Sequence, residues 1–167
     1  MAFIKNISYE TVENMSALTH AHKRSKIACV LYIEIAKSML ENDFEIKKHV
    51  ELACEKIKEY YEGDEELVHF ERIFKNDLDD VRSSGYVITT LECVLHCLLT
   101  TDSYREAVLK AVNFGGDTDT AAAICGGLAG IYYSIEDIPR EWIGCIIDIK
   151  SIYDLCDEFE AFCDESG

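Results

Sequence analysis

The sequence of 167 residues contains a single proline, Pro139, and few basic residues for its size. Because loops and edge strands normally use more proline, this scarcity favours a helical protein. The 16 lysines and arginines are outnumbered by 32 aspartates and glutamates, which gives a formal charge of −16. Such an acidic surface repels phosphate backbones and anionic lipids, so we expect neither nucleic acid nor a membrane as a partner. It also opposes phosphorylated ligands unless a cation mediates the contact.

The sequence also lacks the spacings of a zinc site. None of its eight cysteines forms a CxxC pair, and none has a histidine at zinc-knuckle spacing. Most lie in apolar helical patterns, where a free cysteine behaves as a small hydrophobic residue. The first ten residues contain no apolar signal-peptide core, and no stretch approaches membrane-spanning length. We therefore expect a reduced, cytoplasmic protein.

The apolar residues recur at the three- and four-residue intervals of amphipathic helices. One such stripe covers residues 25–40, and others follow at 50–57 and 67–74, with a break at Gly63. Further helices are predicted over 86–99, over 103–112 and after Gly116.

Residues 86–90, YVITT, are rich in β-branched side chains and could form a strand. Their continuation into LECVLHCLL at helical period favours a helix instead. No internal repeat or linker divides the chain. The sequence therefore predicts an all-α fold class, a single compact multi-helix domain spanning residues 1–167, with about seven to nine helices.

The segment NFGGDTDTAAAICGGLAG, residues 113–130, carries the clearest chemistry. Gly115 and Gly116 permit backbone conformations that other residues resist, and they leave room for a ligand. Two carboxylates and a hydroxyl follow at a predicted helix start, from Asp117, Asp119 and Thr120. Oxygen ligands suit Mg²⁺ or Mn²⁺, and the helix dipole keeps the carboxylates ionised. Aspartate and threonine before a helix are also common caps, a role that needs no metal.

Three segments, in this order, resemble the ADP-ribosylglycohydrolase family of the dinitrogenase-reductase-activating type. SALTHAH at 16–22 resembles its Ser-x-Leu-Thr-His run, and SGYVITTLE at 84–92 its glycine-tyrosine segment. Residues 113–143 resemble its Asp-x-Asp-Thr helix and the Ile-Pro…Trp segment that follows it. Thr89 stands where many relatives carry an acidic residue, and His96 where an aromatic is usual.

The resemblance implies cleavage of the glycosidic bond between ADP-ribose and a protein side chain or small acceptor, with two Mg²⁺ or Mn²⁺ ions. It assigns metal binding to Asp117, Asp119 and Thr120. His20 would approach the ADP-ribose, although it could simply hydrogen-bond beside Thr19. The remaining ligand-binding residues would be Tyr86, which stacks on the base, and Gly115 and Gly116 near phosphate and ribose.

The resemblance covers only the C-terminal part of the family domain. The family's Gly-Asp-x-x-Gly and Thr-Asp-Asp segments, which supply the other metal ligands and the expected catalytic residues, do not occur here. Mg²⁺ prefers about six oxygens, so we expect weak metal binding by this chain alone. Apolar faces left without the missing part must be covered by repacking, by a partner or by a second copy. We therefore expect a homodimer or docking to a separately encoded N-terminal fragment. The chain is then either part of a hydrolase or a catalytically silent module that binds ADP-ribose or oligomerises.

Overall fold

The computed structural model describes residues 2–4, 7–82 and 84–165, which form nine α-helices, two short 3-10 helices and no strand. The predicted all-α fold class is confirmed. The elements in chain order are α1 (Tyr9–Ala17), α2 (Lys23–Glu41), α3 (Ile46–Tyr60), η1 (Glu65–Phe70), α4 (Glu71–Phe74), α5 (Val87–Leu99), α6 (Tyr104–Asn113), α7 (Thr118–Tyr133), η2 (Ile135–Asp137), α8 (Arg140–Ile143) and α9 (Ile149–Glu165). Residues 87–90 are helical rather than extended.

Serine side chains fix the start of two helices. Ser8 Oγ accepts the N–H of Thr11 at 3.2 Å ahead of α1, and Ser103 Oγ accepts the N–H of Glu106 at 3.2 Å ahead of α6. These bonds satisfy N–H groups that the first helical turn leaves unpaired. The predicted start of α6 near residue 103 is thus explained by its cap.

The helix predicted after Gly63 begins as the 3-10 helix η1 and continues as α4. Gly63 has a φ of +82°, which ends the preceding turn. Asp64 then accepts the N–H of Glu66 at 2.9 Å and caps η1. Phe70 and Ile73, both from the predicted stripe, lie in the core with 0% and 2% exposure. The apolar stripe is therefore buried although the first part is wound more tightly than an α-helix.

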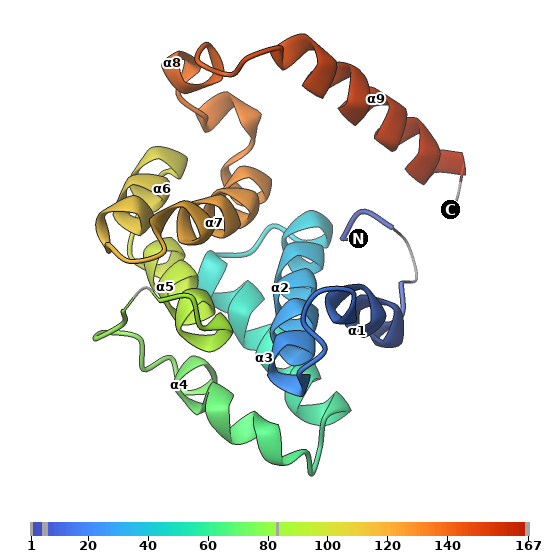
Figure 1. Cartoon of the computed structure of the whole chain (residues 1–167), viewed down its shortest axis with the longest axis vertical. Coiled ribbons are helices and arrows are strands. Elements are labelled where there is room, and N and C mark those ends of the chain that lie inside the picture. The colour runs from blue at the N-terminus through green and yellow to red at the C-terminus, as the bar shows by residue number, and fades with distance from the viewer. Residues whose placement is uncertain (1, 5–6, 83, 166–167) are drawn as a thin grey trace.

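Helix α2 lies at the centre of the bundle and packs against α1, α3, α5 and α7 (Figure 1). Its side chains at Ile27, Val30, Leu31 and Ile35 are fully buried. Burying a side chain of this size stabilises the fold by about 1.5–3 kcal/mol relative to leaving it exposed. The stripe predicted over residues 25–40 is therefore the core face of α2.

Two carboxylates lie in the core, and each has a basic partner. Glu34 accepts a hydrogen bond from Lys56 Nζ at 2.7 Å, and Glu92 accepts one from Arg72 Nη1 at 2.9 Å. Burial raises the pKa of Glu92, while the charge of Arg72 opposes that rise. Arg72 also donates to the carbonyl of Asp80 at 3.3 Å, so this pair fixes the loop before α5 against α4.

The glycines in the middle of α7 allow close packing of neighbouring helices. A Cβ atom added at Gly126 would lie 3.2 Å from the hydroxyl of Tyr104 in α6. One added at Gly127 would lie 2.4 Å from the hydroxyl of Tyr32 in α2, which donates to the carbonyl of Ile124 at 3.1 Å. Side chains at these positions would push α2 and α6 away from α7, so the glycines set the depth at which α7 sits.

The C-terminal segment packs differently from the bundle. Figure 1 shows α9 lying apart from the other helices, with its far end beside the N-terminal segment. Among the described residues, no helix forms an extensive interface with α8 or α9, although the rings of Phe3 and Phe159 meet edge-on with centroids 6.3 Å apart. The exposed apolar side chains of α9 are those of Ile152, Tyr153, Leu155, Phe159 and Phe162. None of the described helices combines the length and apolar character needed to cross a bilayer.

Candidate functional site

Two consecutive glycines make the turn that leads into α7. Gly115 and Gly116 have φ values of +77° and +68°, in the left-handed region that side chains disfavour. Both residues are exposed. These glycines thus adopt backbone conformations that other residues resist, as predicted, whereas their contact with a ligand stays a prediction. The turn leaves Asp119 and Thr120, in the first turn of α7, exposed to solvent.

The two carboxylates of the segment lie in contact at the start of α7. Asp117 occupies the cap position, but its side chain makes no capping hydrogen bond. Asp119 Oδ1 accepts the N–H of Thr120 at 2.9 Å, and this bond, followed by a hydrogen bond with Asp117, lowers the pKa of Asp119. Two carboxyl groups brought together repel unless a proton or a cation lies between them. Asp117 therefore does not act as an ordinary helix cap, and the pair is suited to a cation.

The donor set fits a hard cation in kind but supplies only part of its shell. Two carboxylates and the hydroxyl of Thr120 offer oxygen atoms, the ligands that Mg²⁺ prefers. Within the described ranges, no cluster of three or more histidine, cysteine, aspartate or glutamate side chains is arranged to hold a metal ion. These residues alone therefore provide a partial site.

The glycine-tyrosine segment lies against this helix start. A Cβ atom added at Gly85 would lie 3.9 Å from Asp117 Oδ2, so the turn before α5 adjoins the turn before α7. Tyr86 follows directly, is 42% exposed, and is the residue immediately before α5. Thr89 donates to the carbonyl of Tyr86 at 2.9 Å and is hydrogen-bonded to Ser84 at 2.5 Å. Thr89 therefore closes the turn that presents Tyr86.

His20 lies in the loop between α1 and α2 and is exposed. Its Nδ1 is 3.0 Å from the hydroxyl of Thr19, the local hydrogen bond that the sequence left open as an alternative. The cap of α2 is His22, whose Nδ1 accepts the N–H of Arg24 at 3.2 Å. No hydrogen bond joins His20 to α5 or α7 within the described residues. His20 therefore faces solvent near the start of α2, and its contact with a ligand stays a prediction.

Arg24 contacts the candidate site residue Tyr86, although the sequence did not indicate Arg24 as a site residue. Its guanidinium donates to the hydroxyl of Tyr86 at 3.2 Å and to the carboxylate of Glu66. Arg24 follows the Thr-His motif by four residues, but its partners lie 42 and 62 residues away along the chain. Only the fold brings the three together, so spacing alone carries no signal for them.

His96 fulfils a packing role near the same turn. Its ring meets the ring of Phe114 edge-on, with centroids 5.6 Å apart, and Phe114 directly precedes Gly115. Burial lowers the pKa of His96, with a further contribution from Lys110. His96 thus supports the glycine turn by packing against Phe114.

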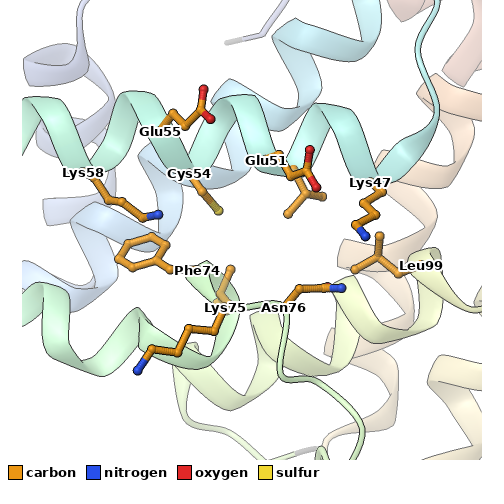
Figure 2. Close-up of a pocket in the computed structure, with 11 residues that line it drawn as sticks. Lys47, Glu51, Cys54, Glu55, Lys58, Phe74, Lys75, Asn76 and Leu99 are labelled. Atoms are coloured by element: carbon orange, nitrogen blue, oxygen red, sulfur yellow. The ribbon is translucent and has the colours of Figure 1, made fainter.

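A separate pocket lies between α3 and α4 (Figure 2). It has a volume of about 340 Å³, and none of the seven candidate site residues lines it. Figure 2 shows the thiol of Cys54 and the amine of Lys58 directed toward Phe74 across this space. Burial raises the pKa of the Cys54 thiol to about 11, which makes it unreactive at neutral pH. This pocket is therefore distinct from the site that the sequence predicted.

Comparison with known proteins finds a family model that matches nearly the whole chain and relatives that match part of it. The family model of ADP-ribosylglycohydrolase matches residues 2–166. The ADP-ribosyl-(dinitrogen reductase) glycohydrolase of Rhodospirillum rubrum is 32% identical over 126 residues, 75% of this chain and 39% of that protein. An ADP-ribosylarginine hydrolase of Serratia proteamaculans is 39% identical over 80 residues, 48% of this chain and 22% of that protein.

A more distant relative has the same kind of name. An ADP-ribosylhydrolase of Mus musculus is 29% identical over 86 residues, 47% of this chain and 23% of that protein. The matches thus cover about two fifths of the Rhodospirillum protein and less than a quarter of the other two.

Proposed function

We propose, since this chain belongs to the ADP-ribosylglycohydrolase family, that it supplies one half of a metal-dependent site for ADP-ribose. Completed by the residues that the family carries in its N-terminal part, the site would cleave the glycosidic bond between ADP-ribose and its acceptor. The observation that carries the proposal is the junction of the turns before α5 and α7, where Asp117 Oδ2 adjoins Gly85 and Tyr86 follows.

The cation would be Mg²⁺ or Mn²⁺, bound by Asp117, Asp119 and Thr120. Two observations support this assignment: the carboxyl groups of Asp117 and Asp119 lie in contact, and the N–H of Thr120 lowers the pKa of Asp119, which favours the charged form of that carboxylate. A bound cation would supply positive charge for the diphosphate in a chain whose formal charge is −16. Binding by this half alone would be weak, because about six oxygen ligands are needed.

The ligand would lie along the two turns. Tyr86 offers an exposed aromatic face for the adenine, and the positive-φ turn at Gly115 and Gly116 lets phosphate or ribose approach the backbone. His20 would reach the ribose by exchanging its local bond to Thr19 for one to the ligand.

The substrate class would be an ADP-ribosylated protein or a small ADP-ribose conjugate, and the location cytoplasmic. The names of the relatives support the substrate class, since one acts on ADP-ribosyl-dinitrogen reductase and another on ADP-ribosylarginine. The free thiols of all eight cysteines are compatible with a reducing compartment.

The experiment is an assay of ADP-ribosylarginine hydrolysis with Mg²⁺. The chain is tested alone and mixed with an N-terminal fragment of the Rhodospirillum relative. We expect little or no turnover alone and measurable turnover in the mixture. Asp119→Asn should abolish it, whereas the matched change Asp157→Asn on α9 should not. Absence of turnover in both conditions would sink the hydrolytic proposal.

A second candidate function, a silent module that oligomerises, is favoured by one observation. The fold leaves two apolar surfaces uncovered. One is a groove of about 630 Å³ between α2 and α7, and the other is the set of exposed apolar side chains of α9. Each of these surfaces needs a partner, which a second copy or a separately encoded N-terminal fragment would supply. Light scattering decides between a monomer and a dimer, and calorimetry with ADP-ribose tests whether a non-hydrolytic module still binds ligand.

A further inference from the structure

The side chain of Arg24 links three parts of the chain at the candidate site. Arg24 lies in the first turn of α2, four residues after His20. Its Nε donates to the Oε2 atom of Glu66 in η1, and its Nη1 donates to the phenol oxygen of Tyr86 at 3.2 Å. The side chains of Arg24 and Glu66 are 29% and 28% exposed. One guanidinium thus joins the starts of α2 and α5 to η1.

The ring of Tyr86 has one polar contact that fixes its direction. Its backbone is fixed separately, because its N–H donates to Ser84 Oγ at 3.2 Å and its carbonyl accepts from Thr89 Oγ1 at 2.9 Å. The side chain is 42% exposed, so packing restrains the ring only in part. Among the described residues, the phenol has Arg24 as its hydrogen-bond partner. The bond to Arg24 therefore determines which way the exposed face of the ring points.

Arginine is suited to this double contact because its donors are arranged in a planar fork. One edge holds Glu66 while another nitrogen reaches Tyr86, which the single ammonium of lysine cannot reproduce in the same geometry. The hydrogen bond from Arg24 lowers the pKa of Glu66, and the bond to Glu66 raises the pKa of Arg24. The pair stays charged at neutral pH, with His69 Nε2 3.6 Å from the same Glu66 oxygen.

We propose that Arg24, held in place by Glu66, is a positioning residue that orients the ring of Tyr86 to stack on the adenine of bound ADP-ribose. This inference rests on the proposed function, since it presumes that ADP-ribose binds at the junction of α5 and α7. Glu66 already balances the charge of Arg24, so the guanidinium acts through Tyr86 and not directly on the diphosphate.

The test is an NMR titration of the full chain, in Mg²⁺, with ADP-ribose and separately with ribose 5-phosphate, which has no base. Arg24→Met, Arg24→Lys and Tyr86→Phe should each weaken ADP-ribose binding by about fivefold, the size of a lost aromatic stacking geometry. Binding of ribose 5-phosphate should not change. Because both residues act through one hydrogen bond, the double variant Arg24→Met with Tyr86→Phe should lose no more than either single variant.

Arg105→Met is the matched control, since Arg105 forms a comparable ion pair with Glu141 at 2.6 Å elsewhere on the surface. It should leave both affinities unchanged. If circular dichroism shows that Arg24→Met is unfolded, the titration is made with Tyr86→Phe and Glu66→Gln instead.

Retained affinity in Arg24→Lys would overturn the positioning role, because the charge alone would then suffice. Equal weakening of both ligands by Arg24→Met would also overturn it. Failure of the unaltered chain to bind ADP-ribose would overturn the proposed function and this inference together, a result distinct from either outcome with the variants.

Discussion

Helices α7 and α9 have nearly equal lengths, 16 and 17 residues, but opposite surroundings. Helix α7 is rich in small side chains and packs against α2, α5 and α6. Helix α9 carries larger apolar side chains and leaves them exposed. The comparison shows that apolar character does not by itself bury a helix, because burial also needs an opposing surface. Stability should therefore depend on α7, whereas association should depend on α9.

The largest expected effect comes from truncating a leucine on each helix. Leu128 of α7 is 0% exposed and Leu155 of α9 is 64% exposed. Leu128→Ala should lower the free energy of unfolding by about 2–5 kcal/mol, because it leaves a cavity in a packed core. Leu155→Ala should change it by less than about 0.5 kcal/mol. Urea denaturation of the two variants measures the difference. If Leu155→Ala lowered the free energy of unfolding by more than about 1 kcal/mol, α9 would contribute to stability as α7 does.

A smaller effect is expected at Gly127, where α7 meets Tyr32. In Gly127→Ala the new methyl group would collide with the Tyr32 hydroxyl, and we expect a net loss of about 1 kcal/mol. In a Tyr32→Phe background the collision is removed, since the next ring atom is 3.8 Å from the Cβ position. There the same change should raise stability by about 1 kcal/mol through helix propensity. Thermal denaturation of the four proteins tests this, and a stabilising effect in both backgrounds would contradict close packing of α7.

The pH dependence of stability should also belong to the bundle, since α9 contains no histidine. Burial lowers the pKa of His49, which is hydrogen-bonded to Ser38 at 2.9 Å and to the carbonyl of Phe44 at 3.0 Å. The unfolded chain takes up the proton near the ordinary value of 6.5, whereas the folded chain resists it. The stabilisation is thus present above that pH and is lost as the pH falls below it.

Comparing the wild-type chain with His49→Gln between about pH 7.5 and 5.5 isolates this contribution, because both proteins share the same acidic surface. The wild-type chain should lose more stability on acidification than the variant. Equal losses would show that His49 is free to take up a proton in the folded state.

The smallest effect on stability is expected from charge placed on α9. Leu155→Glu should leave the unfolding free energy within about 0.5 kcal/mol of the wild-type value. If the apolar face of α9 mediates association, the same variant should lower the mass measured by light scattering. An unchanged dimer in Leu155→Glu would assign association to another surface, such as the groove between α2 and α7.

Much of the fold followed from the sequence because helical periodicity is a local property. The stripe over residues 25–40, the start of a helix near residue 103 and the conformational freedom of Gly115 were all recognisable from neighbouring residues. The tighter winding of η1 was not, because the same apolar stripe is compatible with α- and 3-10-helical geometry.

The candidate site was predictable only in part. Asp117, Asp119 and Thr120 stand together in the chain, so their grouping needed no tertiary information. The junction of Gly85 with Asp117 and the bond from Arg24 to Tyr86 join residues 32 and 62 positions apart. Such contacts depend on how α2, α5 and α7 pack, which periodicity does not specify.

The most direct test of the account is calorimetry of ADP-ribose binding to the full chain, with and without Mg²⁺, for the wild-type protein and Asp119→Asn. We expect a weak binding heat that requires Mg²⁺ in the wild-type chain and is absent in Asp119→Asn. Binding that is the same with and without Mg²⁺, or no binding by the wild-type chain, would contradict a half-site at the start of α7.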